Sequence, residues 1–154
     1  SAPEKIETKA LLDDIKKQTE GLLEIYHLAM NWEEKRDSQT LTIVYDQVVR
    51  AVMNIIQNAA EHTPEGGCIR IHVEEEKESL RFTVEDSGKG FTKEALLHGA
   101  DQFFMDDTSR SGEAHYGIGL FFAKSVAKRH GGDIILTNSQ DTGGAQVSIW
   151  FAVS

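Results

Sequence analysis

The chain has 154 residues, with 16 Lys and Arg against 25 Asp and Glu and a formal net charge of −9. This length suits one domain with a buried core, and the acidic balance argues against a surface for nucleic acid or anionic lipid. A single cysteine, Cys68, allows no internal disulfide and fits a reducing compartment. Because no apolar run is long enough to span a bilayer, we expect one globular domain, residues 1–154, without direct membrane contact.

The first forty residues contain one helical and one extended pattern. Apolar spacing predicts a short amphipathic helix that ends near Gly21, with a buried side made of Ile6, Ala10, Leu11 and Ile15. Residues 23–33 alternate between two faces, which predicts a strand, and residues 35–39 form a polar loop. The chain opens abruptly and without a signal peptide, so residues 1–20 are interpreted as the leading segment of a piece cut from a longer chain.

A longer helix follows and has a polar stripe beside its apolar face. The apolar positions recur at steps of three and four residues and include Val48, Val52, Ile55, Ile56 and Ala59. We expect Thr42 or Asp46 to cap its N-terminus, and the Pro-Glu-Gly-Gly sequence at residues 64–67 to end it.

The polar stripe consists of Asn54, Asn58 and His62, which are four residues apart and therefore share one side of the helix. Asparagine is a poor helix former, so two of them in mid-helix call for a reason. An amide oxygen is a hard, neutral ligand suited to Mg²⁺, which usually accompanies substrate phosphates. Taken alone, two helical asparagines more often indicate a solvated surface than a metal site.

An antiparallel hairpin is predicted after this helix. Apolar residues alternate with polar ones over residues 69–73 and again over residues 80–86. The charged residues 74–79 between them are interpreted as a turn, and the glutamate run at residues 74–76 as a solvated hairpin end.

The second hairpin strand ends in an acidic residue on its apolar face. Period-two alternation places Asp86 on the same side as Phe82 and Val84. A carboxylate in a core is costly unless it is hydrogen bonded, and Gly88 and Gly90 allow positive φ and the close approach of a flat ligand. These features suit a purine whose exocyclic amine donates to Asp86. The simpler alternative is a strand that ends in an Asp-Ser-Gly turn.

The remaining sequence predicts two helices and two closing strands around a loop. A short helix at residues 93–97 precedes a polar, weakly patterned stretch at residues 106–115, which is interpreted as a mobile loop. Residues 116–120 then open an apolar helix, and glycines at such a place leave N–H groups free for phosphate. The closing strands comprise residues 134–136 and 147–151 and are joined through a Gly-containing turn.

Five short motifs occur in a fixed order along the chain: Asn54-x-x-x-Asn58-Ala59, Asp86-x-Gly88-x-Gly90-Phe91, Gln102-Phe103-Phe104, Gly117-x-Gly119-Leu120 and Gly143-Gly144. They resemble the N, G1, F, G2 and G3 boxes of the ATP-binding catalytic domain of bacterial sensor histidine kinases, in the superfamily of DNA gyrase B, the Hsp90 chaperones and MutL. The resemblance covers about residues 20–153. It implies an α/β (α+β) two-layer sandwich, with a mixed, mainly antiparallel five-stranded sheet, three main helices on one face and a mobile ATP lid at residues 106–115.

The same resemblance implies ATP and Mg²⁺ as cofactors. Asp86 would accept the adenine amine beside Gly88 and Gly90, Asn58 would hold Mg²⁺, and His62 would flank the nucleotide. The other nucleotide-binding positions would be Asn54, Phe91, Arg110, Tyr116, Gly117, Ile118, Gly119 and Leu120. Residues 117–120 would direct backbone N–H groups at the phosphates, and Asn54 is the candidate catalytic residue.

Four positions depart from the family pattern. Glu61 and Met105 stand where a basic residue is usual, His115 where the first G2 glycine is common, and Ala145 where a threonine usually follows the G3 glycines. Arg110 is the remaining candidate for a positive charge beside the phosphates.

The resemblance implies a protein-histidine kinase. None of the six histidines lies in the H-(E/D)-x-(R/K)-x-P type of setting that marks the phosphorylated histidine of that family. The expected acceptor is therefore a histidine on a separate dimerisation domain, with a response regulator as a further partner and little self-phosphorylation in isolation. The expected location is cytoplasmic, within a parent protein anchored in a membrane.

Three other functions remain open at this point. One is a nucleotide-gated binding module of the same superfamily, similar to an anti-sigma factor. Another is an ATPase of the gyrase or Hsp90 type, which would need a carboxylate base where this chain has Asn54. The third is a structural module without a ligand, which leaves a buried Asp86 without a partner.

Overall fold

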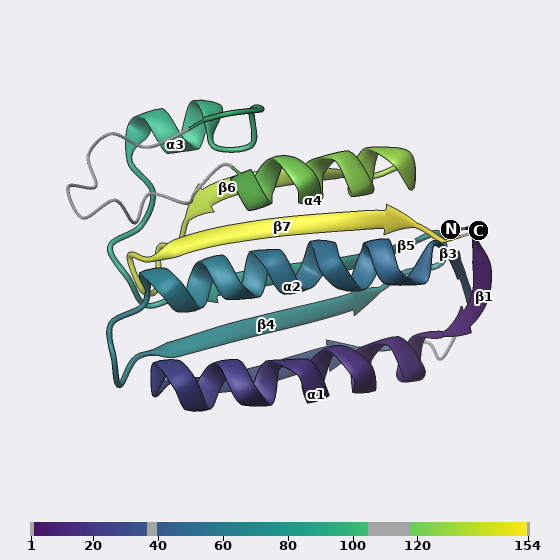
Figure 1. Ribbon diagram of the computed structural model, residues 1–154, viewed down its shortest axis with the longest axis horizontal. Helices are drawn as coiled ribbons and strands as arrows, with labels where there is room; N and C mark the ends of the chain where they lie inside the picture. The colour runs from purple at the N-terminus through teal and green to yellow at the C-terminus, as the bar shows by residue number, and fades with distance from the viewer. Residues whose placement is uncertain (1, 37–39, 105–117, 154) are drawn as a thin grey trace.

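The computed structural model describes residues 2–36, 40–104 and 118–153. They form two layers, with a five-stranded sheet covered on one face by three helices (Figure 1). The strands, in spatial order, are β2 (Ala29–Lys35), β4 (Cys68–Glu75), β5 (Ser79–Asp86), β7 (Ala145–Ala152) and β6 (Asp133–Asn138). Only β2 and β4 are parallel. The predicted mixed, mainly antiparallel sandwich is confirmed.

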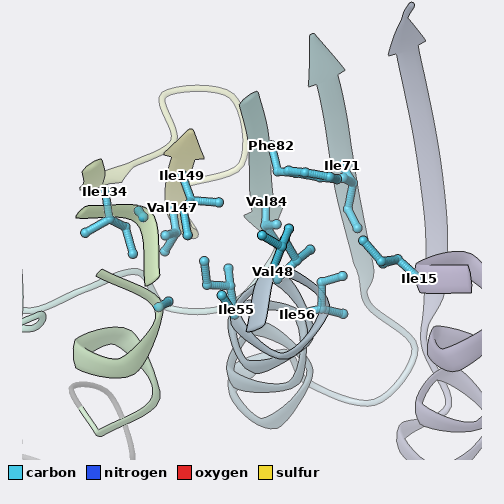
Figure 2. Packing of buried hydrophobic residues seen from close by; sticks show 14 of the residues in the cluster. Ile15, Val48, Ile55, Ile56, Ile71, Phe82, Val84, Ile134, Val147 and Ile149 are labelled. Carbon is cyan, nitrogen blue, oxygen red and sulfur yellow. The ribbon is translucent and has the colours of Figure 1, made fainter. Parts of the chain in front are cut away.

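The covering helices are α1 (Thr8–Tyr26), α2 (Tyr45–His62) and α4 (Ile118–Arg129), while the short α3 (Lys93–His98) lies apart from them (Figure 1). Helix α2 is central, because it contacts both α1 and α4. Its apolar side chains Val48, Ile55 and Ile56 point into the sheet layer, as Figure 2 shows. They meet strand residues that include Ile71, Phe82, Val84, Val147 and Ile149. No described helix is long and apolar enough to cross a bilayer.

The N-terminal predictions were partly wrong. Helix α1 continues through Gly21 to Tyr26, so residues 23–26 are helical and the following strand, β2, begins only at Ala29. An added Cβ at Gly21 would meet nothing within 4 Å, so this exposed glycine imposes no break. The helix ends instead at His27, whose left-handed backbone (φ 55) lets its N–H and that of Leu28 reach the last carbonyl groups. Lys35, expected in a loop, belongs to β2.

A second, two-stranded sheet was not predicted. It pairs β1 (Glu4–Glu7) with β3 (Thr40–Ile43), so Ile6 lies in a strand rather than in the first helix. The expected caps of α2 were also wrong, because Thr42 belongs to β3 and the N-cap residue is Val44, which has no capping side chain. The N–H of Val44 donates to His130 Nε2, 3.1 Å away, so the residue directly after α4 satisfies one N–H group at this helix start.

The interpretation of the glutamate run at residues 74–76 as a solvated hairpin end was wrong for Glu75. This residue is buried, and its carboxylate accepts a hydrogen bond from the hydroxyl of Thr8, the first residue of α1. The turn is also shorter than expected, because Glu74 and Glu75 belong to β4 and Ser79 belongs to β5. The helix stop after His62 and the helix at residues 93–98 agree with expectation. Figure 1 shows that α2 and β5 end, and β7 and α4 begin, at the same end of the sandwich.

Candidate functional site

Asp86 lies at that end of the sandwich, on the helix-covered face of the sheet as predicted, and is 2% exposed. Its Oδ1 accepts two backbone hydrogen bonds, from the N–H of Gly88 at 2.9 Å and from that of Ala145 at 3.0 Å. Within the described part of the chain, no group donates to Oδ2. Burial raises the pKa of the Asp86 carboxyl despite the two N–H groups. The second oxygen therefore remains able to accept a donor from a ligand.

A small cavity adjoins this carboxylate. Its walls come from α2, β5, β7 and α4 and from the segment after β5, with Ile55, Asn58, Ala59, Val84, Asp86, Phe91, Leu120, Ala145 and Val147 as lining residues. All but two of these side chains are apolar, and the two polar ones are Asp86 and Asn58. Apolar walls with one carboxylate acceptor suit a flat, weakly polar ring that has an N–H donor.

Asn58 is buried rather than solvated, so the surface interpretation of this residue was wrong. It is 7% exposed, and its Oδ1 has no hydrogen-bond partner in the part of the chain that the structure describes. Such an atom costs about 1–3 kcal/mol unless something binds it. His62, one turn later, contacts the backbone carbonyl of Asn58 through Nδ1 at 2.9 Å, and Asn54, one turn earlier, is half-buried.

A metal at Asn58 would depend on ligands that arrive with the nucleotide. Among residues 2–36, 40–104 and 118–153, no group of three or more His, Cys, Asp or Glu side chains could hold a metal ion. A neutral amide oxygen in a buried position nevertheless fits Mg²⁺, which takes few protein ligands and keeps phosphate oxygens and water.

The two glycines after Asp86 have different roles. Gly90 has a positive φ of 86°, as expected. Gly88 does not have a positive φ. An added Cβ at this position would lie 2.2 Å from the carbonyl oxygen of His62, so the absence of a side chain allows the turn to pack against the end of α2. The close neighbour of Gly88 is therefore the protein backbone. Phe91 is buried and lines the cavity.

The connection between β6 and β7 also builds the site, and most of its contacts were not expected from the sequence. Asn138 bonds the backbone of Phe91 twice, through Oδ1 at 2.7 Å and Nδ2 at 3.1 Å. Thr142 donates its hydroxyl to the backbone oxygen of Asp86 at 2.9 Å. Gly144, one of the expected G3 glycines, lies so close that an added Cβ would be 2.0 Å from this oxygen. Polar residues after a predicted strand were the only sequence signal for Asn138 and Thr142.

Part of the predicted site lies outside the described residues. This applies to the expected lid at residues 106–115, to Arg110, Tyr116 and Gly117, and to Met105 and His115. Ile118 and Gly119 form the first turn of α4, and Leu120 is fully buried beside the cavity. The structure thus brings Asp86, Asn58, Phe91 and Leu120 together, with His62, Gly88 and Asn54 around them.

Comparisons with curated proteins give a consistent group of relatives. The family "Histidine kinase-, DNA gyrase B-, and HSP90-like ATPase" matches residues 43–154. Sensor histidine kinase SpaK of Bacillus subtilis is 43% identical over 100 residues, which cover 65% of this chain and 22% of SpaK. Nisin biosynthesis sensor protein NisK of Lactococcus lactis subsp. lactis is 35% identical over 146 residues, which cover 92% of this chain and 32% of NisK. The chain therefore corresponds to a third or less of these two relatives.

Solved structures support the fold. The nucleotide-free catalytic domain of histidine kinase ThkA superimposes with a TM-score of 0.84 at 19% identity, over 99% of both chains. The ATP-binding domain of PrrB from Mycobacterium tuberculosis gives a TM-score of 0.74 at 19% identity, over 100% of this chain and 99% of that one. With the matched family, the order of motifs and the sheet topology in agreement, the chain belongs to the histidine kinase-, DNA gyrase B- and HSP90-like ATPase family, as an ATP-binding domain of the histidine kinase type.

Proposed function

We propose that this chain binds Mg-ATP and donates its γ-phosphoryl group to a histidine on a dimerisation domain of the same sensor kinase. The observation that carries the proposal is the buried Asp86 at the cavity, with Oδ1 fixed by two backbone N–H groups and no donor from the described residues on Oδ2. A structural carboxylate in such a place would be satisfied on both oxygens. A carboxylate with one open oxygen suits the exocyclic amine of adenine.

The base is proposed to enter the apolar cavity beside Asp86. Val84 and Val147 line it from the sheet, and Ile55 and Leu120 from the helices. These side chains exclude water, so the hydrogen bond to Oδ2 forms in a low-dielectric setting, where an unpaired group is costly. Selection of an amine-bearing purine follows from this cost.

The phosphates and Mg²⁺ are proposed to lie toward the C-terminal half of α2. Asn58 would hold the ion through Oδ1, which has no partner among the described residues, and Asn54 and His62 would flank the nucleotide. When bound, Mg²⁺ neutralises phosphate charge. Arg110, Tyr116 and the backbone N–H groups of residues 117–120 are proposed to meet the phosphates, and residues 106–115 to close over them.

The proposed reaction needs no water-activating base. Asn54 carries an amide, which cannot take a proton from water, so hydrolysis is expected to be slow. In the transfer step a ring nitrogen of the acceptor histidine bonds to the γ-phosphorus as the bond from that phosphorus to the β–γ bridging oxygen breaks, and ADP leaves. The chain contributes position and charge stabilisation, and the acceptor contributes the nucleophile. A response regulator is the proposed next recipient; the related kinase ThkA has been solved in complex with the response regulator TrrA.

Phosphoryl transfer in trans tests this proposal. The chain is mixed with the purified dimerisation and histidine domain of its kinase and with γ-³²P-labelled Mg-ATP. We expect label on that domain, none without the chain, and little label or released phosphate from the chain alone. A domain with its acceptor histidine replaced by alanine is the matched control. Rapid phosphate release by the chain alone would favour an ATPase, and tight Mg-ATP binding without transfer would favour a nucleotide-gated binding module.

A further inference from the structure

The end of strand β5 carries two consecutive buried carboxylates, and the proposed function uses only the second. Glu85 is 5% exposed and points to the sheet face opposite Asp86. Its Oε1 accepts from Arg70, with Nε at 2.8 Å and Nη2 at 2.6 Å. Its Oε2 accepts from the hydroxyl of Ser139, which is 6% exposed. Both carboxylate oxygens of Glu85 are therefore engaged by protein side chains, and one of these side chains, Ser139, belongs to the connection between β6 and β7.

Ser139 organises the β6–β7 connection. Besides donating to Glu85, its hydroxyl oxygen accepts from the N–H groups of Asp141 at 3.2 Å and Thr142 at 3.3 Å. Its backbone N–H donates to Gly144 O at 2.8 Å, and its carbonyl accepts from the N–H of Gly143 at 2.9 Å. This one buried residue therefore makes hydrogen bonds to four residues of the connection, and its hydroxyl links the connection to β5 through Glu85.

The same connection fixes Asp86. The Ala145 N–H supplies one of the two hydrogen bonds on Asp86 Oδ1, and the Thr142 hydroxyl bonds the Asp86 backbone oxygen. Gly144 packs against that oxygen without room for a Cβ. Three contacts of Asp86, one with its carboxylate and two with its backbone oxygen, thus depend on a loop whose geometry is set from the other face of the sheet.

We propose that Ser139, anchored by Glu85 and through it by Arg70, is a positioning residue for the amine-accepting oxygen of Asp86. This inference rests on the proposed binding of adenine at Asp86. Among the described residues, no hydrogen bond joins Ser139 directly to a residue that lines the cavity, so it acts on the base through Ala145 and Thr142. Loss of the Ser139 hydroxyl should make the orientation of Asp86 Oδ2 less well defined. The apolar walls of the cavity and the phosphate-binding residues should be unchanged.

The test compares two triphosphates that differ only in the amine. ATP and purine riboside 5′-triphosphate, which lacks the exocyclic amine, each displace a fluorescent ATP analogue from the chain in the presence of Mg²⁺. Ser139→Ala should weaken the binding of ATP by roughly two- to tenfold, the range expected for one hydrogen bond. The affinity for the amine-free analogue should be nearly unchanged. Ser139→Thr, which keeps the hydroxyl, should restore much of the preference for ATP.

Ser148 provides the matched control. It is 8% exposed on the neighbouring β7, faces the same side of the sheet, and its hydroxyl bonds Thr83 at 2.9 Å. Ser148→Ala removes a comparable hydrogen bond without touching the β6–β7 connection, so it should keep the wild-type preference. Thermal unfolding measures the folded population of each variant. If Ser139→Ala folds poorly, Thr142→Val, at an exposed position of the same connection, should show the same selective loss.

The outcomes separate this inference from the proposed function. Asp86→Asn should abolish the preference for ATP over the amine-free analogue, and a preference that survives this change would overturn adenine binding at Asp86. If Asp86→Asn abolishes it but Ser139→Ala behaves like Ser148→Ala, the positioning role is wrong. Equal weakening of both triphosphates in Ser139→Ala would also overturn it, because a general loosening of the fold does not depend on the amine.

Discussion

Glu85 and Asp86 are neighbours in sequence, both buried, and yet opposite in character. On the outer face of β5, the oxygens of Glu85 accept from a guanidinium and a hydroxyl. On the helix-covered face, Asp86 receives two backbone N–H groups on the same oxygen, and no other donor comes from residues 2–36, 40–104 and 118–153. The pKa values of the two carboxyl groups differ accordingly. Burial acts to raise the pKa of Glu85, but the hydrogen bonds from Ser139 and Arg70 outweigh burial, so this pKa is lowered. At Asp86 the effect of burial is larger than that of the two N–H groups, so its pKa is raised. A carboxylate with satisfied oxygens supports the fold, and one with an open oxygen is available to a ligand.

The largest expected effect is on ligand binding when the open carboxylate is changed. Asp86→Asn can keep Oδ1 toward Gly88 and Ala145 but presents an NH₂ group to the adenine amine. The unpaired donors should cost about 1–3 kcal/mol of ATP binding free energy. Titration with a fluorescent ATP analogue measures this loss.

Unfolding of the same variant provides the control. The raised pKa of Asp86 means that the wild-type fold loses stability as the pH rises between the unfolded and folded pKa values of this group. Asn has no such loss, so Asp86→Asn should be at least as stable as wild type at pH 7. A variant that binds poorly because it is unfolded would contradict the assigned role.

The turn after Asp86 should tolerate no side chain. In Gly88→Ala the new Cβ would lie 2.2 Å from the His62 carbonyl, so the turn or the end of α2 must move, at a cost of about 1–3 kcal/mol in the free energy of unfolding. Gly21→Ala is the matched control, since its Cβ meets nothing within 4 Å, and it should stabilise α1 by about 0.5–1 kcal/mol. Urea denaturation measures both. Equal stability of the two variants would contradict the close packing of Gly88.

Asn58 extends the comparison from the base to the phosphates. Asn58→Ala removes Oδ1, which no described residue bonds, but leaves Asp86 and its N–H donors in place. We expect Mg-ATP to bind more weakly while adenosine changes little, because the ion acts on phosphate charge. Isothermal titration with each ligand, with and without EDTA, tests this. Removal of metal should weaken ATP binding in the wild type and have less effect on ATP binding in the variant. If Asn58→Ala weakens ATP and adenosine binding equally, the metal assignment is wrong.

The smallest expected effect concerns acid stability. Because the pKa of Glu85 is lowered in the fold, its ionised form contributes stability that is present at neutral pH and is lost as the pH falls through that lowered value. Glu85→Gln should therefore be less stable than wild type at pH 7, and the gap should narrow below about pH 4. Chemical denaturation across this pH range shows the trend. If the difference in free energy of unfolding between wild type and Glu85→Gln stays constant with pH, the charge of Glu85 does not contribute to stability.

The sequence alone determined which face many residues occupy. Alternation put Asp86 on the covered side of its strand, helical spacing put Asn54, Asn58 and His62 on one stripe of α2, and the order of motifs indicated the family and its sandwich. Such patterns are local, because the period of a helix or strand relates residues a few positions apart to a common environment.

Only the tertiary structure decided which distant groups satisfy one another. Glu75 is buried because Thr8, 67 residues away, reaches it, and Ser139 bonds Glu85 across 54 residues. At the start of α2, the N–H of Val44 donates to His130 across 86 residues, where local signals pointed to Thr42 or Asp46 as caps. These pairs depend on strand register and helix placement, which leave no periodic trace in the sequence. The burial of Asp86 was therefore predictable from its own strand, whereas the loop that aims it could be found only in the assembled fold.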